Sequence, residues 1–249
     1  DVTQNKKEIV YGMDIAIAIK DAIYQKTGLT ASAGISYNKF LAKIASDYNK
    51  PNGYFVITPL RALPFLEQLP IEKFFGVGKV TAEKMHQRNS LFRFNLKKQS
   101  LEDLTRWFGK AGKYYYNVVR GVDHRAVNPN RVRKSVGAER TFEEDLTTIS
   151  LLQQKLVEIK DVLIDRLQKS KTKGKTLTLK VKYGDFTQIT RSKTKDSFWE
   201  SDELLTVSEA LLSEIECLEK GVRLLGLSVS NFERLEGDQF MGKQMNLGL

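Results

Sequence analysis

The chain has 249 residues, 41% of them hydrophobic, which is enough for two or three compact units and excludes global disorder. Its net charge is +10 and its pI is about 9.5, which favours a polyanionic partner, most simply nucleic acid. A single cysteine, Cys217, excludes an internal disulfide and is typical of a reducing compartment. No apolar run approaches membrane-spanning length and no signal peptide is visible, so we expect a cytoplasmic protein with no membrane partner.

The first 59 residues read as helix, strand, helix and strand. Apolar spacing predicts helices over 6–26, closed by Gly28, and over 38–48, with Ser36 as the candidate N-cap. Apolar runs predict strands over 29–35 and 54–57, and the sequence Lys-Pro-Asn-Gly at 50–53 predicts a turn. This is the pattern of an α+β layer.

Three lysines lie in or next to the second of these helices. Lys39 and Lys43 share a helix face because they are four residues apart, and Lys50 follows the last turn. Ammonium groups on one rigid element hold polyphosphate well, so we predict a phosphate site. Ordinary solvated lysines are the alternative explanation.

Residues 60–121 read as short helices broken by glycine. Gly76 and Gly78, followed by Lys79 and Thr81, predict a tight turn at the start of a helix, where backbone N–H groups can approach a phosphate. A simple interhelical turn is the alternative. Residues 62–121 hold eleven lysines and arginines against five acidic residues, which favours an anionic ligand. His86, in the same region, is interpreted as a plain surface residue.

Residues 122–130 have little apolar periodicity and are interpreted as a linker. From 131 the pattern becomes strand, helix, strand, strand, helix, strand, with strands expected over 131–142, 175–183, 186–193 and 222–232. Two helices, over 150–170 and 202–218, can cover one face of this four-stranded sheet. Because residues 166–195 hold ten basic residues and one acid, we predict that the open face contacts a DNA backbone.

The sequence S-x-N-K-x-x-A-K-x-A-S-x-x-x-K-P-N-G, which ends at Gly53, resembles the signature of Y-family translesion DNA polymerases, most closely their bacterial polymerase IV type. The resemblance extends with less strict motifs over essentially the whole chain. It implies an α+β multidomain fold: a partial, ferredoxin-like palm (1–59), a helical thumb with a helix-hairpin-helix (60–121), a linker (122–130), a little finger (131–234) and a flexible tail (235–249).

The resemblance also implies partners and roles. Lys50 is expected to reach the triphosphate of the incoming dNTP, together with Lys43. Primer–template DNA is expected at the following residues: Gly76, Gly78, Lys79, Thr81, Arg131, Arg133, Lys134, Ser135, Lys180, Lys182, Arg191 and Lys193. The ending Gln-x-x-Leu-x-Leu, with Gln244, Leu247 and Leu249, resembles a peptide that binds the bacterial sliding clamp.

The family's metal-binding carboxylates do not match any acid of this chain. They lie before the Asp-Val-Thr with which the chain opens, and no initiator methionine precedes Asp1, so the chain looks cut from a longer protein. We therefore expect Mg²⁺ to serve the complete enzyme, no metal ligand or catalytic residue in this chain, and no activity from it alone. The alternative is a non-catalytic module of a truncated gene that binds DNA and a sliding clamp. A generic RNA-binding protein fits the charge but not the signature.

Overall fold

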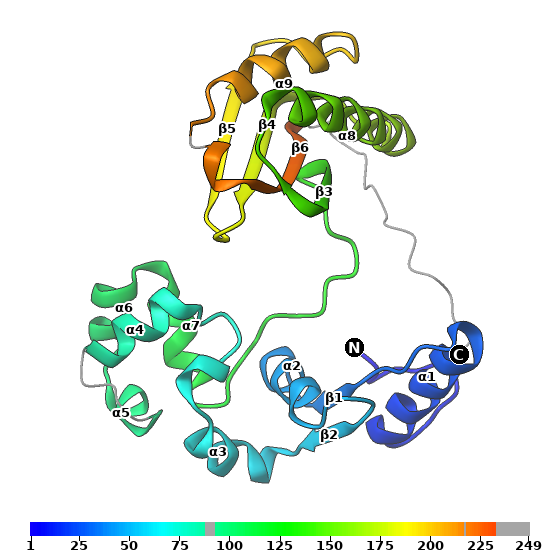
Figure 1. Cartoon of the computed structure of the whole chain (residues 1–249). Helices are drawn as coiled ribbons and strands as arrows, with labels where there is room; N and C mark the ends of the chain where they lie inside the picture. The colour runs from blue at the N-terminus through cyan, green and yellow to red at the C-terminus, as the bar shows by residue number, and fades with distance from the viewer. Residues whose placement is uncertain (88–92, 217, 233–249) are drawn as a thin grey trace. The chain divides into compact units, whose positions relative to one another are not determined.

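A computed structural model describes residues 1–87, 93–216 and 218–232 (Figure 1). The chain forms two compact units that meet in sequence between Pro129 and Asn130. Unit 1 holds a two-stranded sheet and most of the helices, and unit 2 holds a four-stranded sheet with long helices. The mixed α+β class predicted from the sequence is confirmed.

Unit 1 begins with a helix–strand–helix–strand segment whose elements are α1 (Gly12–Thr27), β1 (Ala33–Ser36), α2 (Lys39–Tyr48) and β2 (Tyr54–Ile57). The strands are parallel, with Ala33 opposite Tyr54. As predicted, Gly28 ends α1 in the left-handed region at φ +71°, and its N–H donates to Tyr24 O.

Two predicted boundaries in this segment are wrong. The first helix starts at Gly12 rather than at residue 6, and the first strand starts at Ala33 rather than at residue 29. The N-cap of α2 is Asn38 and not Ser36, because Ser36 is still part of β1 and its hydroxyl donates to Ile57 O.

The remaining elements that the structure describes in unit 1 are helices. They are α3 (Pro59–Gln68), η1 (Ile71–Lys73), α4 (Lys79–Gln87), α5 (Arg93–Lys98), α6 (Leu101–Phe108) and α7 (Lys110–Val118). These helices share one apolar core with α2, which includes Phe40, Phe74 and Tyr115. Tyr115 therefore packs in the core.

Unit 2 is an antiparallel sheet with strand order β3-β6-β4-β5. Its elements are β3 (Ser135–Leu146), α8 (Ile149–Ser170), β4 (Gly174–Tyr183), β5 (Gln188–Thr194), α9 (Glu203–Ser213), η2 (Leu218–Lys220) and β6 (Val222–Phe232). Leucines of α8 and α9 bury one face of this sheet, formed by alternate residues such as Leu177 and Leu179. Buried residues alternate along β4, and the predicted bounds of β6 are confirmed.

Some bounds in unit 2 differ from the prediction. The first strand starts at Ser135 rather than at Arg131, because its ladder with β6 ends at the Ser135–Ser230 pair, beside Asn231 with its left-handed φ of +58°. The second helix ends at Ser213 rather than at residue 218. No helix in the described parts of the chain is long and apolar enough to cross a membrane.

Candidate functional site

Helix α2 is held unusually close to β1. An added Cβ on Gly34 would lie 2.1 Å from Ala42 O and 2.2 Å from Ser46 N, so only glycine permits this approach. The side chain of Asn38 accepts from the Leu41 N–H at 2.9 Å and starts the helix. The apolar side of α2 is buried, which leaves Lys43 on the solvent side.

Lys43 and Lys50 meet at one carboxylate. Asp47 pairs with Lys43 through Oδ2 and with Lys50 through Oδ1, the latter at 2.6 Å, and all three side chains are about half exposed. The hydrogen bond from Lys43, followed by that from Lys50, holds the pKa of Asp47 below its usual range. Lys39 does not join them, because its Nζ donates to Ala126 O at 2.7 Å. The structure therefore brings together two of the three lysines.

The predicted hairpin turn comprises residues 74–78, between η1 and α4. Gly76 has φ +89°, which only glycine adopts readily, and an added Cβ would lie 3.2 Å from the Tyr114 ring. The Tyr114 hydroxyl donates to Phe75 O at 2.7 Å and braces the turn. Gly78 has open space around its Cα, and α4 begins one residue later. These contacts define the backbone shape of the turn in the absence of a ligand.

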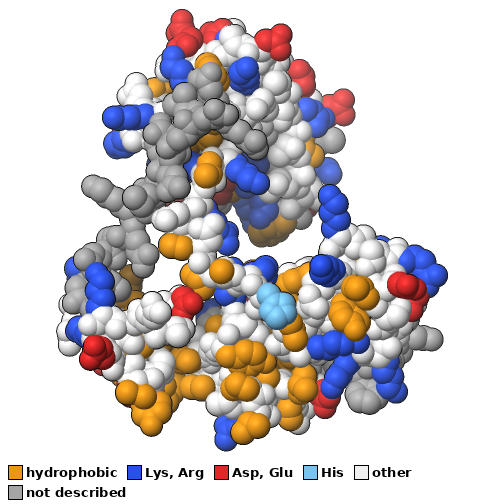
Figure 2. Space-filling view, turned by 180° about the vertical axis from the view of Figure 1, so that it is seen from behind, with side chains coloured by type: hydrophobic (Ala, Val, Ile, Leu, Met, Phe, Trp, Pro, Cys, Tyr) orange, Lys and Arg blue, Asp and Glu red, His pale blue; other side chains and the backbone are white. Residues whose placement is uncertain are grey.

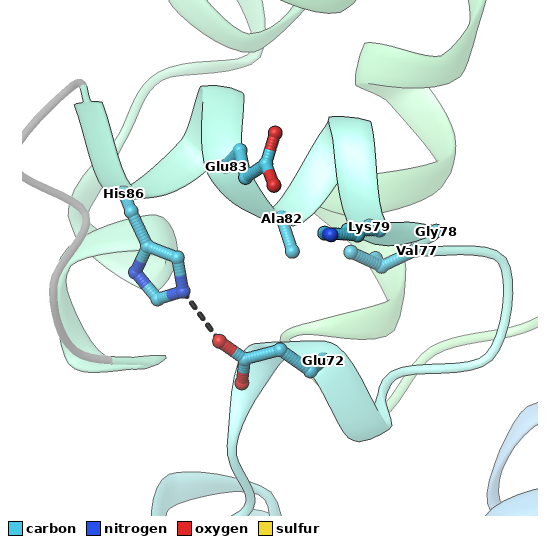
Figure 3. Close-up of a pocket in the computed structure, with 7 residues that line it drawn as sticks. All are labelled: Glu72, Val77, Gly78, Lys79, Ala82, Glu83 and His86. Carbon is cyan, nitrogen blue, oxygen red and sulfur yellow. Dashed lines mark hydrogen bonds and ion pairs between the residues drawn. The ribbon is translucent and has the colours of Figure 1, made fainter.

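A shallow pocket next to this turn is lined by Glu72, Val77, Gly78, Lys79, Ala82, Glu83 and His86 (Figure 3). His86 Nε2 lies 2.5 Å from Glu72 Oε1, so the residue interpreted as a plain surface histidine has a partner. Hydrogen bonds from the backbone N–H of Glu72 and from His86 lower the pKa of the Glu72 carboxyl. Glu72 and Glu83 line this pocket together with Lys79 and His86, so it presents ionisable groups of both signs.

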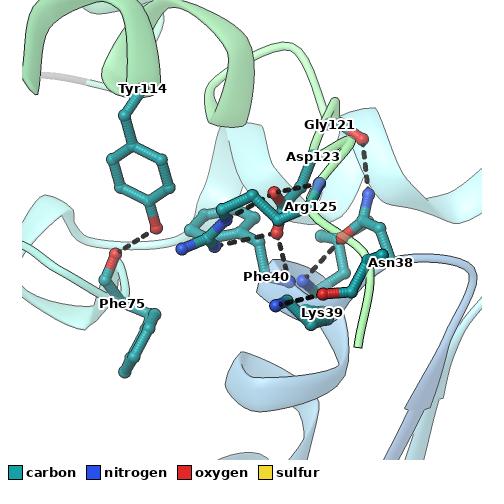
Figure 4. A network of polar contacts seen from close by, with 10 residues as sticks. Asn38, Lys39, Phe40, Phe75, Tyr114, Gly121, Asp123 and Arg125 are labelled. Atoms are coloured by element: carbon teal, nitrogen blue, oxygen red, sulfur yellow. Dashed lines mark hydrogen bonds and ion pairs between the residues drawn. The ribbon is translucent and has the colours of Figure 1, made fainter. Parts of the chain in front are cut away.

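Residues 121–126 are fastened to the start of α2, a feature that the interpretation of 122–130 as a linker missed (Figure 4). Gly121 O accepts from Asn38 Nδ2 at 2.8 Å, and Asp123 accepts from the Phe40 N–H at 3.1 Å. Arg125 pairs with Asp123 through two hydrogen bonds and lowers the pKa of its carboxyl. The Asp-x-Arg spacing was visible in the sequence, but its partner on α2 lies 83 residues away and carries no sequence signal.

The side of the unit 2 sheet away from α8 and α9 is called the open face. The strand registers place on it Ser135, Gly137, Glu139 and Thr141 of β3, Thr176, Thr178, Lys180 and Lys182 of β4, Gln188, Thr190, Ser192 and Thr194 of β5, and Leu224, Gly226, Ser228 and Ser230 of β6. Hydroxyls pair across its strands, as in Thr178–Ser192 at 2.9 Å. Lys180 Nζ lies 2.8 Å from Glu139 Oε2, so the open face carries an acid as well as lysines.

The other predicted basic residues lie elsewhere. Arg191 and Lys193 stand opposite Leu179 and Leu177, which places them on the helix side of β5 rather than on the open face. Arg131, Arg133 and Lys134 are exposed in the segment before β3. Gln244, Leu247 and Leu249 lie outside the described residues. The ligands of all these residues remain predictions.

Comparisons with known proteins give consistent matches. The model of the impB/mucB/samB family matches residues 1–47, and that of its C-terminal domain matches residues 133–247. A DNA polymerase IV of Bacteroides fragilis is 47% identical over 97% of this chain and 66% of its own length. A DNA polymerase IV of Listeria monocytogenes is 44% identical over 95% of this chain and 69% of its own. A solved Y-family DNA polymerase chimera superposes with a TM-score of 0.73 at 25% identity, over 89% of this chain and 64% of the chimera.

These matches define the class of protein as the Y-family DNA polymerases. Within that class, the chain belongs to the DNA polymerase IV family. The resemblance drawn from the sequence signature is therefore confirmed. The chain spans 66% and 65% of the length of the Bacteroides fragilis and Agrobacterium fabrum relatives, so it corresponds to about two thirds of each.

Proposed function

We propose that this chain is a portion of an error-prone translesion DNA polymerase, an enzyme that carries out DNA-templated nucleotidyl transfer. The observation that carries the proposal is the 47% identity to a DNA polymerase IV along 97% of the chain. In this proposal residues 1–59 are part of the palm, 60–121 the thumb, 131–234 the little finger and 235–249 a tail.

The proposal assigns a ligand to the lysine pair of Lys43 and Lys50, to the hairpin turn and to the open face. Lys43 and Lys50 hold the triphosphate of the incoming dNTP, because two ammonium groups, one on α2 and one just after its end, can neutralise adjacent phosphates. The hairpin turn and the open face hold the backbone of primer–template DNA through N–H groups, hydroxyls and lysines. Each contact is to phosphate, so binding should be independent of base sequence and dependent on salt.

Y-family DNA polymerases generally use divalent metal ions. Within residues 1–87, 93–216 and 218–232, no group of three or more His, Cys, Asp or Glu side chains is arranged to hold one. The described residues therefore do not fit a metal site, and we assign to them only the binding of DNA and of phosphate groups.

We expect the chain to bind a primer–template duplex in fluorescence anisotropy and to add no nucleotide to the primer when Mg²⁺ and all four dNTPs are present. This expectation follows from the proposed roles, which assign DNA-binding surfaces to this chain but no metal site to its described residues. Absence of DNA binding at low salt would contradict the proposal. Primer extension that survives a control for contaminating polymerase would contradict the division of roles.

Asp47 competes with phosphate for the two lysines, so Asp47→Asn should strengthen the binding of inorganic tripolyphosphate. Two exposed ion pairs must be broken when the polyphosphate enters, and each is worth about 0.2–1 kcal/mol. We expect the affinity to rise roughly 2–30-fold in isothermal titration. Asp21→Asn, an equal change of charge on α1, is the matched control and should have little effect. A weaker complex in Asp47→Asn would show that the carboxylate organises the site instead.

We also propose that the tail binds a sliding clamp through Gln244, Leu247 and Leu249. Burial of two leucine side chains is worth roughly 3–6 kcal/mol before the ordering of the tail is subtracted, which favours a micromolar affinity. The measurement is titration calorimetry with a β-type clamp, using the whole chain and a version that ends at Lys243. Equal binding by both versions would exclude the tail as the anchor.

A further inference from the structure

The start of α2 is completed by a carboxylate from the segment that follows α7. Asp123 is only 3% exposed, and its Oδ2 accepts from the Phe40 N–H, one of the N–H groups that the first turn of a helix leaves without an internal partner. Asn38 satisfies the next such group, on Leu41. A negative charge at this end of a helix is also favoured by the helix dipole. The helix that carries Lys43 therefore depends on Asp123 for its first turn.

Asp123 is in turn fixed by Arg125. The guanidinium donates to both carboxylate oxygens, from Nε at 2.7 Å and from Nη2 at 2.8 Å. Two parallel hydrogen bonds of this kind fix orientation as well as distance. The carboxylate therefore cannot turn away from α2 without breaking the pairing with Arg125.

The same guanidinium reaches the hairpin turn through one aromatic ring. It lies 4.9 Å from the centroid of the Tyr114 ring, a distance at which a cation is attracted to the ring face. The Tyr114 hydroxyl donates to Phe75 O in the turn, and its ring packs edge-on against Phe40 at 6.3 Å. Figure 4 shows these side chains converging from α7, the turn and the start of α2.

We propose that Asp123, Arg125 and Tyr114 are positioning residues that make the hairpin turn and the first turn of α2 open and close as one unit. Local opening in proteins occurs in cooperative units, and a ligand that binds only the closed form stabilises every part of its unit. DNA bound at the hairpin turn therefore steadies the helix that presents Lys43 to the triphosphate. This inference rests on the proposed function, because it requires DNA to bind at the turn.

The test is hydrogen exchange of the whole chain, with and without a primer–template duplex at ten times its dissociation constant. Peptides that cover the turn and peptides that cover the start of α2 are followed separately. In the unmodified chain we expect exchange to slow by about tenfold in both places. In Arg125→Met the turn should still be protected, whereas the protection of α2 should be lost.

Two further variants make the result specific. Tyr114→Phe keeps the aromatic ring and its packing, and it removes only the hydroxyl that donates to Phe75 O. We expect this variant also to lose the protection of α2 while the turn stays protected. Arg120→Met is the matched control. Arg120 lies 3.6 Å from the Tyr116 ring centroid and donates to the carbonyls of Tyr116 and Lys97, so the chemistry is the same without the contact to Asp123. It should leave the protection of α2 intact.

The possible failures are distinguishable. If DNA binds but leaves the turn unprotected in the unmodified chain, the proposed role of the turn is wrong and the inference falls with it. In the second case DNA protects the turn, but the slowing of exchange in α2 is the same in the unmodified chain as in Arg125→Met and Tyr114→Phe. The proposed function then stands and the proposed coupling is wrong.

Discussion

Replacement of Gly34 by alanine should unfold the β1–α2 part of the chain. The added Cβ would lie within 2.8 Å of three backbone atoms, namely Ala42 O, Ser46 N and the carbonyl carbon of Ala45. Backbone atoms cannot move aside by changing rotamer, so α2 must separate from β1 and from the core that Phe40 and Leu41 fill. We expect a loss of about 3 kcal/mol or more, at or above the usual range for overpacking.

Urea denaturation monitored by hydrogen exchange would separate the effect on unit 1 from that on unit 2. Gly78→Ala is the matched control, because an added Cβ there meets no atom within 4 Å and the change of residue type is the same. We expect that variant to retain the stability of the unmodified chain, and unit 2 to be unaffected in both. A Gly34→Ala chain as stable as the control would show that α2 does not need this close approach.

Reversal of both Lys180 and Lys182 to glutamate should weaken DNA binding on every sequence alike. Both lysines lie on the open face, where Lys180 already pairs with Glu139 and two more acids would repel the phosphates. Loss of two phosphate contacts lowers the slope of log affinity against log salt by about two. At 0.1 M salt this corresponds to a fall in affinity on the order of 50-fold.

The measurement is fluorescence anisotropy with one duplex over a series of salt concentrations. Lys155→Glu with Lys169→Glu is the matched control, since it changes the net charge equally on α8, which covers the opposite side of the sheet. An equal loss in both double variants would mean that only the total charge matters. Unchanged affinity and slope would remove the open face from the DNA-binding model.

Periodic patterns made much of unit 2 predictable. The alternation along β4 placed Leu177, Leu179 and Val181 on the buried side, and apolar residues of α8 at three- and four-residue steps formed its buried stripe, which contains Leu152, Leu156, Ile159 and Leu163. Both patterns can be read from neighbouring residues, because a strand or helix with one buried face repeats apolar residues at the period of that element. Lys43 on α2 and Lys50 just after it were found from a local pattern as well, because both lie in one short motif with a proline turn.

The remaining features depend on contacts between distant residues. Whether Arg191 lies on the open face depends on the register of β5 against β4, which a sequence of mixed Thr, Arg, Ser and Lys does not specify. Asp123 looked like part of a linker because its partner on α2 is reached only after the whole of unit 1 has folded. The choice of Asn38 over Ser36 as N-cap was decided by the pairing of β1 with β2.

The paired hydroxyls of the open face also limit what it can recognise. In Thr176–Thr194 and Thr178–Ser192 either oxygen can be the donor, because a hydroxyl rotates to suit its neighbour. Discrimination between base pairs requires donors and acceptors in a fixed order. A surface of rotating hydroxyls has no such order. In the proposed complex, the open face would therefore set no register between the protein and the base sequence of its DNA.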